Sequence, residues 1–252
     1  MDNHLKNTLR ELLVALADDE LILGHRDSEW CGHAPILEED IAFANLALDE
    51  IGHANLWYSV LADLEEADRQ SFVDRMVYWR DAPDFRNIQM VELPNGDWAF
   101  SMLRHYVFDS AEIERLNVLA ESVFPPLAET AAKIRTEEYY HLRHTRLWLR
   151  RLGLGTAESR QRLQAALDQL WPYTGQLFEM PGEPDHLFAL GIKMDQASLS
   201  WEAQVIPFLG ECQLILPAGA ERLLNRQEHS RHLPILLAEM QSVARLDPEA
   251  EW

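Results

Sequence analysis

Two Glu-x-x-His motifs are the residues of this sequence whose types and spacing could do chemistry. They are Glu50–His53 and Glu138–His141, and each lies in a stretch of helical periodicity. Residues three positions apart project from one face of a helix, so each motif places a carboxylate beside an imidazole. Carboxylates and imidazoles together suit iron and manganese, so the motifs indicate a metal site.

The motif by itself is weak evidence, because a chain with 42 acidic residues and 10 His will contain it by chance. About two matches are expected at random in such a composition. The sequence has three, and the third, Glu183–His186, lies in a Pro-rich stretch that predicts a loop. The positions of the other two motifs in the chain must therefore decide whether they are chance matches or parts of a site.

Each of these two motifs has an acidic residue facing it across a predicted helical hairpin. In an antiparallel hairpin, residues at one level are about equidistant from the turn. Glu20 precedes Glu50 by 30 residues, and Asp109 precedes its partner Glu138 by 29. Both midpoints fall on predicted turns, so the two halves of the chain repeat one plan of acid, turn and Glu-x-x-His.

The four acids also occupy the apolar stripes of their helices. Glu20, for example, lies between Leu16 and Leu23 at helical spacing. Burying an unpaired carboxylate costs several kcal/mol, so a buried set of four needs compensation. Bundles with two metal ions draw one carboxylate from each of two helices and Glu-x-x-His from two others. We therefore predict a dinuclear iron or manganese site with six ligands, Glu20, Glu50, His53, Asp109, Glu138 and His141.

Alternatives stay open for these residues. Acids on helices are mostly solvated, and a buried His can be an ordinary core residue. The set could also be vestigial, with carboxylates hydrogen-bonded to imidazolium groups and no metal. Without metal, four close carboxylates cannot all ionise, so at least one pKa should be raised. Glu112 and Glu137 are alternative carboxylates, while His105 and His144 are interpreted as ordinary helix residues or as neighbours of the ligands.

The elements that must position these residues are long helices. Apolar residues at spacings of three and four predict four of them, over residues 5–26, 36–64, 97–122 and 125–152. Shorter helical pieces are expected within residues 66–96 and at 157–171, 197–206 and 230–245, with a loop at 180–185.

No segment alternates apolar and polar residues for long enough to demand a sheet. No low-complexity tract or linker divides the chain either. We therefore predict one all-α domain over residues 1–252. Its core is a four-helix bundle in residues 1–152, and residues 153–252 add further helices and loops.

The composition excludes several classes of function. A net charge of −20 repels phosphate backbones and anionic lipid, which argues against binding to nucleic acid or to a membrane surface. No apolar run is long enough for a membrane span, and the N-terminus has no apolar signal core, so a cytoplasmic location is expected. There is no Gly-rich phosphate loop for a nucleotide or flavin. Cys31 and Cys212 form neither a disulfide framework nor a C-x-x-C metal site.

Five short motifs spread along the chain form a more specific pattern, Glu29–Pro35, Asn45–Asp49, Pro94–Gly96, Tyr140–Arg143 and Leu237–Gln241. In order and spacing they resemble the C-type subunits of bacterial phenylacetyl-CoA 1,2-epoxidases along essentially the whole chain. The resemblance implies a ferritin-like fold. It also implies a multicomponent monooxygenase that inserts one oxygen of O2 into the aromatic ring of phenylacetyl-CoA.

In that family the working di-iron site belongs to a related A-type subunit, and a flavin and iron–sulfur reductase brings electrons from NADPH. The C-type subunit is regarded as the non-catalytic partner of the A-type subunit, with a degraded metal site. The resemblance therefore implies an A-type subunit as the direct partner and no catalytic residue in this chain. The sequence departs from this picture, because all six predicted metal ligands are present.

Three hypotheses follow. The first is a partner subunit of the epoxidase, with or without its own dinuclear metal site. The second is a stand-alone di-iron carboxylate oxidase or a ferritin-like metal-binding protein. The third is a helical interaction module without metal. Stoichiometric iron would separate the first two from the third, and a stable complex with a ferritin-like paralogue would separate the first from the second. Self-association is left open by the sequence.

Overall fold

The computed structural model describes residues 3–218 and 225–248, which fold into eleven α-helices and two short 3-10 helices without a strand. The predicted all-α, ferritin-like fold is confirmed. No helix of this described part has the length and apolar character that a membrane crossing needs. The chain divides into two compact units, and the first joins residues 3–94 with residues 225–248.

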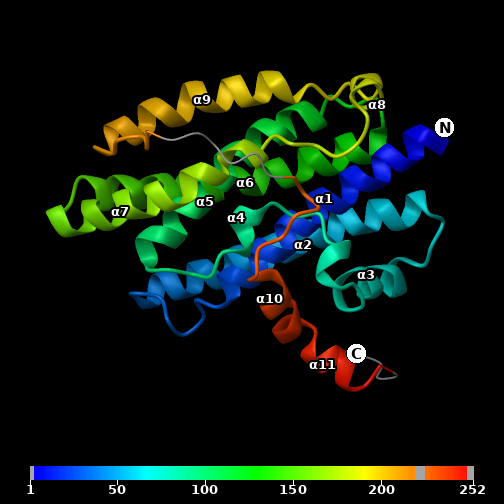
Figure 1. The fold of residues 1–252 in the computed structure, drawn as a ribbon, viewed down its shortest axis with the longest axis horizontal. Coiled ribbons are helices and arrows are strands. Elements are labelled where there is room, and N and C mark those ends of the chain that lie inside the picture. The colour runs from blue at the N-terminus through cyan, green and yellow to red at the C-terminus, as the bar shows by residue number, and fades with distance from the viewer. Residues whose placement is uncertain (1–2, 219–224, 249–252) are drawn as a thin grey trace. The chain divides into compact units, whose positions relative to one another are not determined.

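The first unit is built on a hairpin of two long helices, α1 (Asn3–Ser28) and α2 (Leu37–Leu64) (Figure 1). The chain turns between them at residues 29–36, which is the break predicted from the sequence. Acidic residues fill the first turn of α2, where they favour the positive end of the helix dipole. Helix α1 is buried over most of its length, from Thr8 to Asp27.

Shorter elements complete the first unit. The side chain of Asp68 caps α3 by accepting a hydrogen bond from the backbone N–H of Ser71 at 3.0 Å. Near the C-terminus, Arg226 donates to the Asp19 carboxylate at 2.9 Å, which fixes the returning chain to α1. The remaining elements are α3 (Arg69–Tyr78), a 3-10 turn (Ala82–Asp84), α4 (Gln89–Glu92), α10 (Leu233–Met240) and α11 (Ser242–Leu246).

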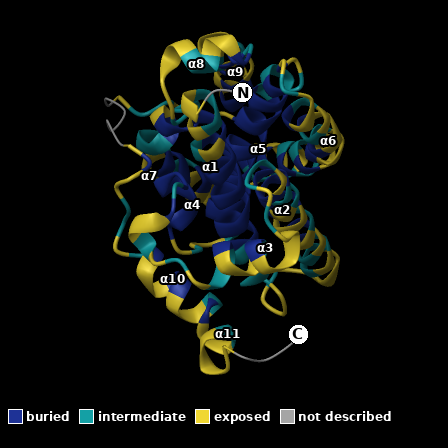
Figure 2. Cartoon of the chain, turned by 90° about the vertical axis from the view of Figure 1, so that its right-hand side faces the viewer, coloured by how far each residue is buried: buried dark blue, intermediate teal, exposed yellow. Residues whose placement is uncertain are grey.

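The second unit repeats the hairpin with α5 (Trp98–Leu119) and α6 (Pro125–Gly153). Asp97 caps α5, and Pro125 begins α6, where its missing N–H costs nothing. Helix α5 is buried almost throughout, whereas α6 buries a single stripe and exposes its other face (Figure 2). The unit is completed by α7 (Ala157–Leu170), a 3-10 segment (Trp171–Gln176), α8 (Pro184–Ala189) and α9 (Met194–Glu211).

The four long helices begin and end within three residues of their predicted bounds. The shorter helices differ more. Helix α8 begins at Pro184, inside the predicted loop, because proline is tolerated in the first turn of a helix. Helix α9 continues through Pro207 beyond its predicted end. The predicted helix at 230–245 begins later and is interrupted at Gln241, whose side chain donates to the carbonyl oxygens of Val77 at 2.9 Å and Arg80 at 3.0 Å. The organisation into one domain, with a four-helix bundle in residues 1–152 as its core, stays a prediction.

Candidate metal centre

Three predicted ligands come together on the first hairpin, and we call them the α1–α2 site. Glu20 lies on α1, and Glu50 and His53 lie on α2. One ligand atom from each residue lies within 4.8 Å of the other two, and all three side chains are buried. Nδ1 of His53 is 3.9 Å from Oε2 of Glu50. Two carboxylates and an imidazole at this separation can hold one metal ion.

A glycine allows the two helices to approach closely beside this site. A Cβ at Gly24 would lie 2.9 Å from Cβ of Glu50 and 3.1 Å from the carbonyl oxygen of Ala47. Such distances are shorter than van der Waals contact, so only glycine fits without a shift of the helices. Gly24 lies one turn after Glu20, and nothing in its local sequence marks this close approach.

Asp27 is a further buried acid near this site and is not among the six predicted ligands. It is fully buried on α1, and one of its carboxylate oxygens lies within 4.8 Å of a carboxylate oxygen of Glu50. The sequence signal for Asp27 was its position two turns after Glu20, which places both acids on one face of α1. Asp27 therefore adds a carboxylate beside the α1–α2 site.

The other three predicted ligands lie on the second hairpin, and we call them the α5–α6 site. Asp109 comes from α5, and Glu138 and His141 come from α6. Nδ1 of His141 is 3.2 Å from Oε1 of Glu138. Oδ1 of Asp109 is 3.0 Å from Nδ1 of His105, and the Thr145 hydroxyl lies 3.3 Å from Oδ2 of Asp109. His105 is thus a direct partner of a predicted ligand rather than an ordinary helix residue.

The pKa of Asp109 is raised from its ordinary value of 3.8 to about 7. Burial is the main cause, since it disfavours the charged form, and the negative charge of Glu138 adds to it. His105 and His141 act in the opposite direction. A raised carboxylate pKa is expected for a metal-free site, and the direction of the shift at Asp109 agrees with it, although burial contributes more than the neighbouring carboxylate. The shared site of four carboxylates stays a prediction.

The remaining candidates fall outside both sites. Glu112 is buried but forms an ion pair with Arg115, so its charge is already compensated. Glu137 is exposed and His144 is half-buried. The third Glu-x-x-His match, at 183–186, lies at the surface around the start of α8, which agrees with its interpretation as a chance match.

The buried acids next to Glu20 are also compensated by their own partners. Asp18, Asp19 and Glu20 are consecutive, and all three are buried. Asp18 accepts from the guanidinium of Arg80 at 3.0 Å, and Asp19 pairs with Arg226 at 2.9 Å. Successive residues point in directions about 100° apart around a helix, so the three acids serve different neighbours.

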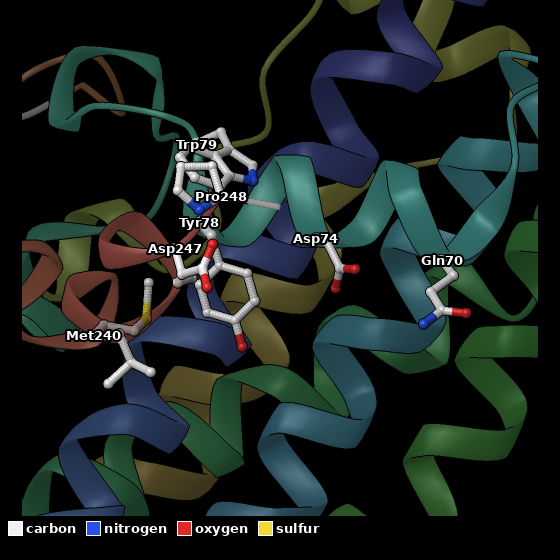
Figure 3. Close-up of a pocket in the computed structure, with 9 residues that line it drawn as sticks. Gln70, Asp74, Tyr78, Trp79, Met240, Asp247 and Pro248 are labelled. Carbon is white, nitrogen blue, oxygen red and sulfur yellow. The ribbon is translucent and has the colours of Figure 1, made fainter. Parts of the chain in front are cut away.

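One cavity of the first unit lies away from these ligands. It has a volume of about 440 Å³ and is lined by α3 and by the C-terminal helices, with Tyr78, Trp79 and Met240 among its walls (Figure 3). None of the six predicted ligands lines it. The candidate chemistry therefore belongs to the interiors of the two hairpins.

The donor sets of both hairpins fit the predicted metals. Each supplies two carboxylates and one imidazole, which is the oxygen and nitrogen chemistry that iron and manganese take in proteins. The residues of each set lie in the buried interior of their own hairpin. That all six converge on one point stays a prediction.

Gly24→Ala should weaken the α1–α2 site, because the added methyl group pushes α2 away from α1 at Glu50. We expect a loss of about 1–3 kcal/mol in the free energy of unfolding. Mn²⁺ affinity should fall as well. Gly52→Ala is the matched control on α2, since nothing lies within 4 Å of a Cβ there. Urea unfolding and calorimetric metal titration measure both effects, and equal behaviour of the two variants would contradict the prediction.

Comparison with known proteins gives a family and two relatives. The family described as "Phenylacetic acid catabolic protein" matches residues 1–252. The chain is 38% identical over 251 residues to the C-type subunit of the 1,2-phenylacetyl-CoA epoxidase of Escherichia coli strain K12, and the match covers 98% of this chain and 100% of the relative. The A-type subunit of the same epoxidase is 25% identical over 171 residues, covering 68% of this chain and 54% of that relative.

Proposed function

The chain belongs to the phenylacetic acid catabolic protein family, and from this we propose that it is the C-type subunit of a phenylacetyl-CoA epoxidase in aerobic phenylacetate degradation. The observation that carries the proposal is the 38% identity to the C-type relative, which extends over the whole of that relative. The similarity to the A-type relative is lower and covers a smaller part of the chain. A cytoplasmic location follows from the proposal, because coenzyme A thioesters are formed and used inside the cell.

The proposed role is to support a catalytic A-type subunit. The A-type subunit of the relative's epoxidase is itself similar to this chain, so the two proposed partners share one ancestry. We assign no catalytic residue to this chain. Its contribution to the oxygenation is the folded surface on which the catalytic subunit is held in its active form.

The buried ligand sets add a second element to the proposal, a dinuclear metal site of the chain's own. Glu20, Glu50 and His53 would hold one iron or manganese ion, and the α5–α6 site would hold the other. Such ions supply redox and Lewis-acid chemistry when bound. Among the chain's own groups, His105 and the Thr145 hydroxyl orient Asp109, whose raised pKa lets it keep a proton near neutral pH.

A second candidate function rests on the same ligands. The six buried residues would also suit a stand-alone di-iron carboxylate oxidase or a ferritin-like metal-binding protein. This alternative requires oxidation or metal storage by the chain alone. The partner role requires neither, so an assay of the purified chain for oxidation or metal storage distinguishes the two functions.

The test is reconstitution with the A-type subunit of the same organism and the reductase that the resemblance implies. We expect a stable complex that forms epoxide from phenylacetyl-CoA, and no epoxide from this chain with the reductase alone. Product formation is measured by chromatography, and assembly by size exclusion. Epoxide formation by the chain alone would favour the second candidate function. Failure to form a complex would reject the partner role.

Glu50→Gln combined with His53→Gln should leave the assembled complex near its wild-type rate, because turnover is assigned to the other subunit. Metal bound by this chain should fall in the same variant, since two of its ligands are removed. Product formation and metal content are measured on the same preparation. A collapse of turnover without loss of assembly would instead make this chain's own site catalytic.

A further inference from the structure

The exposed side of α6 combines arginine with apolar side chains. Tyr139, Tyr140 and Leu147 are 52%, 69% and 59% exposed. Arginines lie three or four positions from these residues, so both kinds of side chain share the side of the helix away from Glu138 and His141. We call this surface the arginine face, and it consists of Tyr139, Tyr140, Arg143, Arg146, Leu147 and Arg150.

The charge of this face is opposite to that of the protein. The chain carries a net charge of −20, with 22 basic against 42 acidic residues. Among the described residues, neither Arg143 nor Arg146 forms an ion pair, and Arg150 pairs with exposed Glu211 at 2.9 Å. Two further carboxylates lie near this face, that of exposed Glu137 on α6 and that of half-buried Glu114 on α5, which lines a small cavity together with Arg146. The arginine face therefore has positive charge available for a partner.

Two of the arginines are held in place by an aromatic ring. The guanidinium groups of Arg146 and Arg150 lie 4.4 and 5.2 Å from the ring centre of Phe208 on α9. Beside them is a shallow cavity of about 260 Å³, walled by Tyr139, Leu142 and the arginines. Ordering the side chains in advance lowers the entropy cost of binding. Tyr and Arg are also the residues that dominate binding energy at protein interfaces.

We propose that the arginine face docks an acidic surface of the catalytic A-type subunit, and this choice of partner rests on the proposed function. Charge complementarity sets the chemistry of the partner. The face runs for about 17 Å along α6 from Tyr139 to Arg150 and exposes three large apolar side chains, which suits a folded protein better than a phosphate group. A symmetric pairing of two copies through this face would place arginine against arginine, so a second copy is disfavoured.

Arg143→Glu combined with Arg146→Glu tests the proposal against a control with the same change in net charge. Arg75→Glu combined with Arg231→Glu also lowers the net charge from −20 to −24. Both control residues are exposed, and the guanidinium of Arg75 lies 5.2 Å from the ring centre of Phe72, a contact of the same kind as that of Arg146 with Phe208 at 4.4 Å. Toward the purified A-type subunit, we expect the arginine-face variant to bind about tenfold more weakly or worse, and the control to bind within about twofold of wild type. Wild-type affinity should also fall with added salt.

Arg143→Glu alone keeps the test decisive if Arg146 proves necessary for folding, because Arg143 is exposed and has no ion pair in the described part of the chain. Equal affinity of the arginine-face variant and the control would overturn the proposal. Loss of self-association with normal binding to the A-type subunit would overturn it in favour of a second copy. If the wild-type chain shows no binding to the A-type subunit, the proposed function fails and this proposal with it.

Discussion

Replacing Asp109 with asparagine should make the metal-free protein more stable above neutral pH and reduce the loss of stability that occurs as the pH rises from about 4 to about 7. Below about pH 3 the carboxyl is mostly protonated in both the folded and the unfolded chain. As the pH rises toward 7, the unfolded chain ionises while the folded chain keeps its proton, so the free energy of unfolding falls. Raising the pKa from 3.8 to about 7 corresponds to about 4 kcal/mol.

Asparagine keeps the shape of the side chain but cannot ionise, so the variant avoids this cost. Chemical unfolding with a chelator present, over the range between pH 5 and pH 8, measures the effect. The control is Asp185→Asn, because Asp185 is exposed on α8 and should change little. Parallel pH profiles for wild type and Asp109→Asn would contradict the prediction. The same variant should bind Mn²⁺ less tightly, since a neutral amide replaces an anionic ligand.

Arg80→Met should cost about 3–5 kcal/mol in the free energy of unfolding, because it leaves the buried Asp18 carboxylate without its counter-charge. The guanidinium of Arg80 donates to both oxygens of Asp18, at 2.5 and 3.0 Å. It also donates to the Tyr58 hydroxyl at 2.8 Å, and Tyr58 in turn donates to Asp18. Asp18 is fully buried, so water cannot replace the lost partner.

Arg69→Met is the matched control for this substitution. Arg69 makes a similar two-pronged contact with Asp63, but its side chain is 63% exposed and that of Asp63 is 53% exposed. Solvent screens such a pair, so a loss of about 1 kcal/mol or less is expected. Urea unfolding compares the two variants. Adding Asp18→Asn to Arg80→Met should recover part of the lost stability, and equal losses from the two single variants would refute the argument.

The long helices and the hairpin geometry were predictable because both rest on local physics. A helix that buries one face repeats its apolar residues every three or four positions, whatever its neighbours are. The same periodicity placed Glu50 and Glu138 among buried residues, and the structure confirms that both are buried. The prediction that each acid faces its motif across the hairpin needs only their equal distances in sequence from the turn. These features could be obtained from the sequence without knowledge of the fold.

Other features required the tertiary structure. The ion pair between Asp19 and Arg226 joins residues 207 positions apart, and neither residue carries a local signal of the other. The spacing of His105 left it either an ordinary helix residue or a neighbour of the ligands, and the structure decides between the two by placing its ring 3.0 Å from Asp109. Gly24 is an ordinary helical glycine until the distance from its missing Cβ to Glu50 is known.

The sequence by itself determined which helices form, where they turn and which acids they bury. These properties depend on interactions between residues a few positions apart, so they can be deduced from order and spacing alone. The tertiary structure decided how each buried charge is compensated, for example that Asp18 is neutralised by Arg80 while burial raises the pKa of Asp109. The compensation of a buried charge depends on its distance from other charges and on the exclusion of water. Both are set by the packing of side chains, many of them from distant parts of the chain.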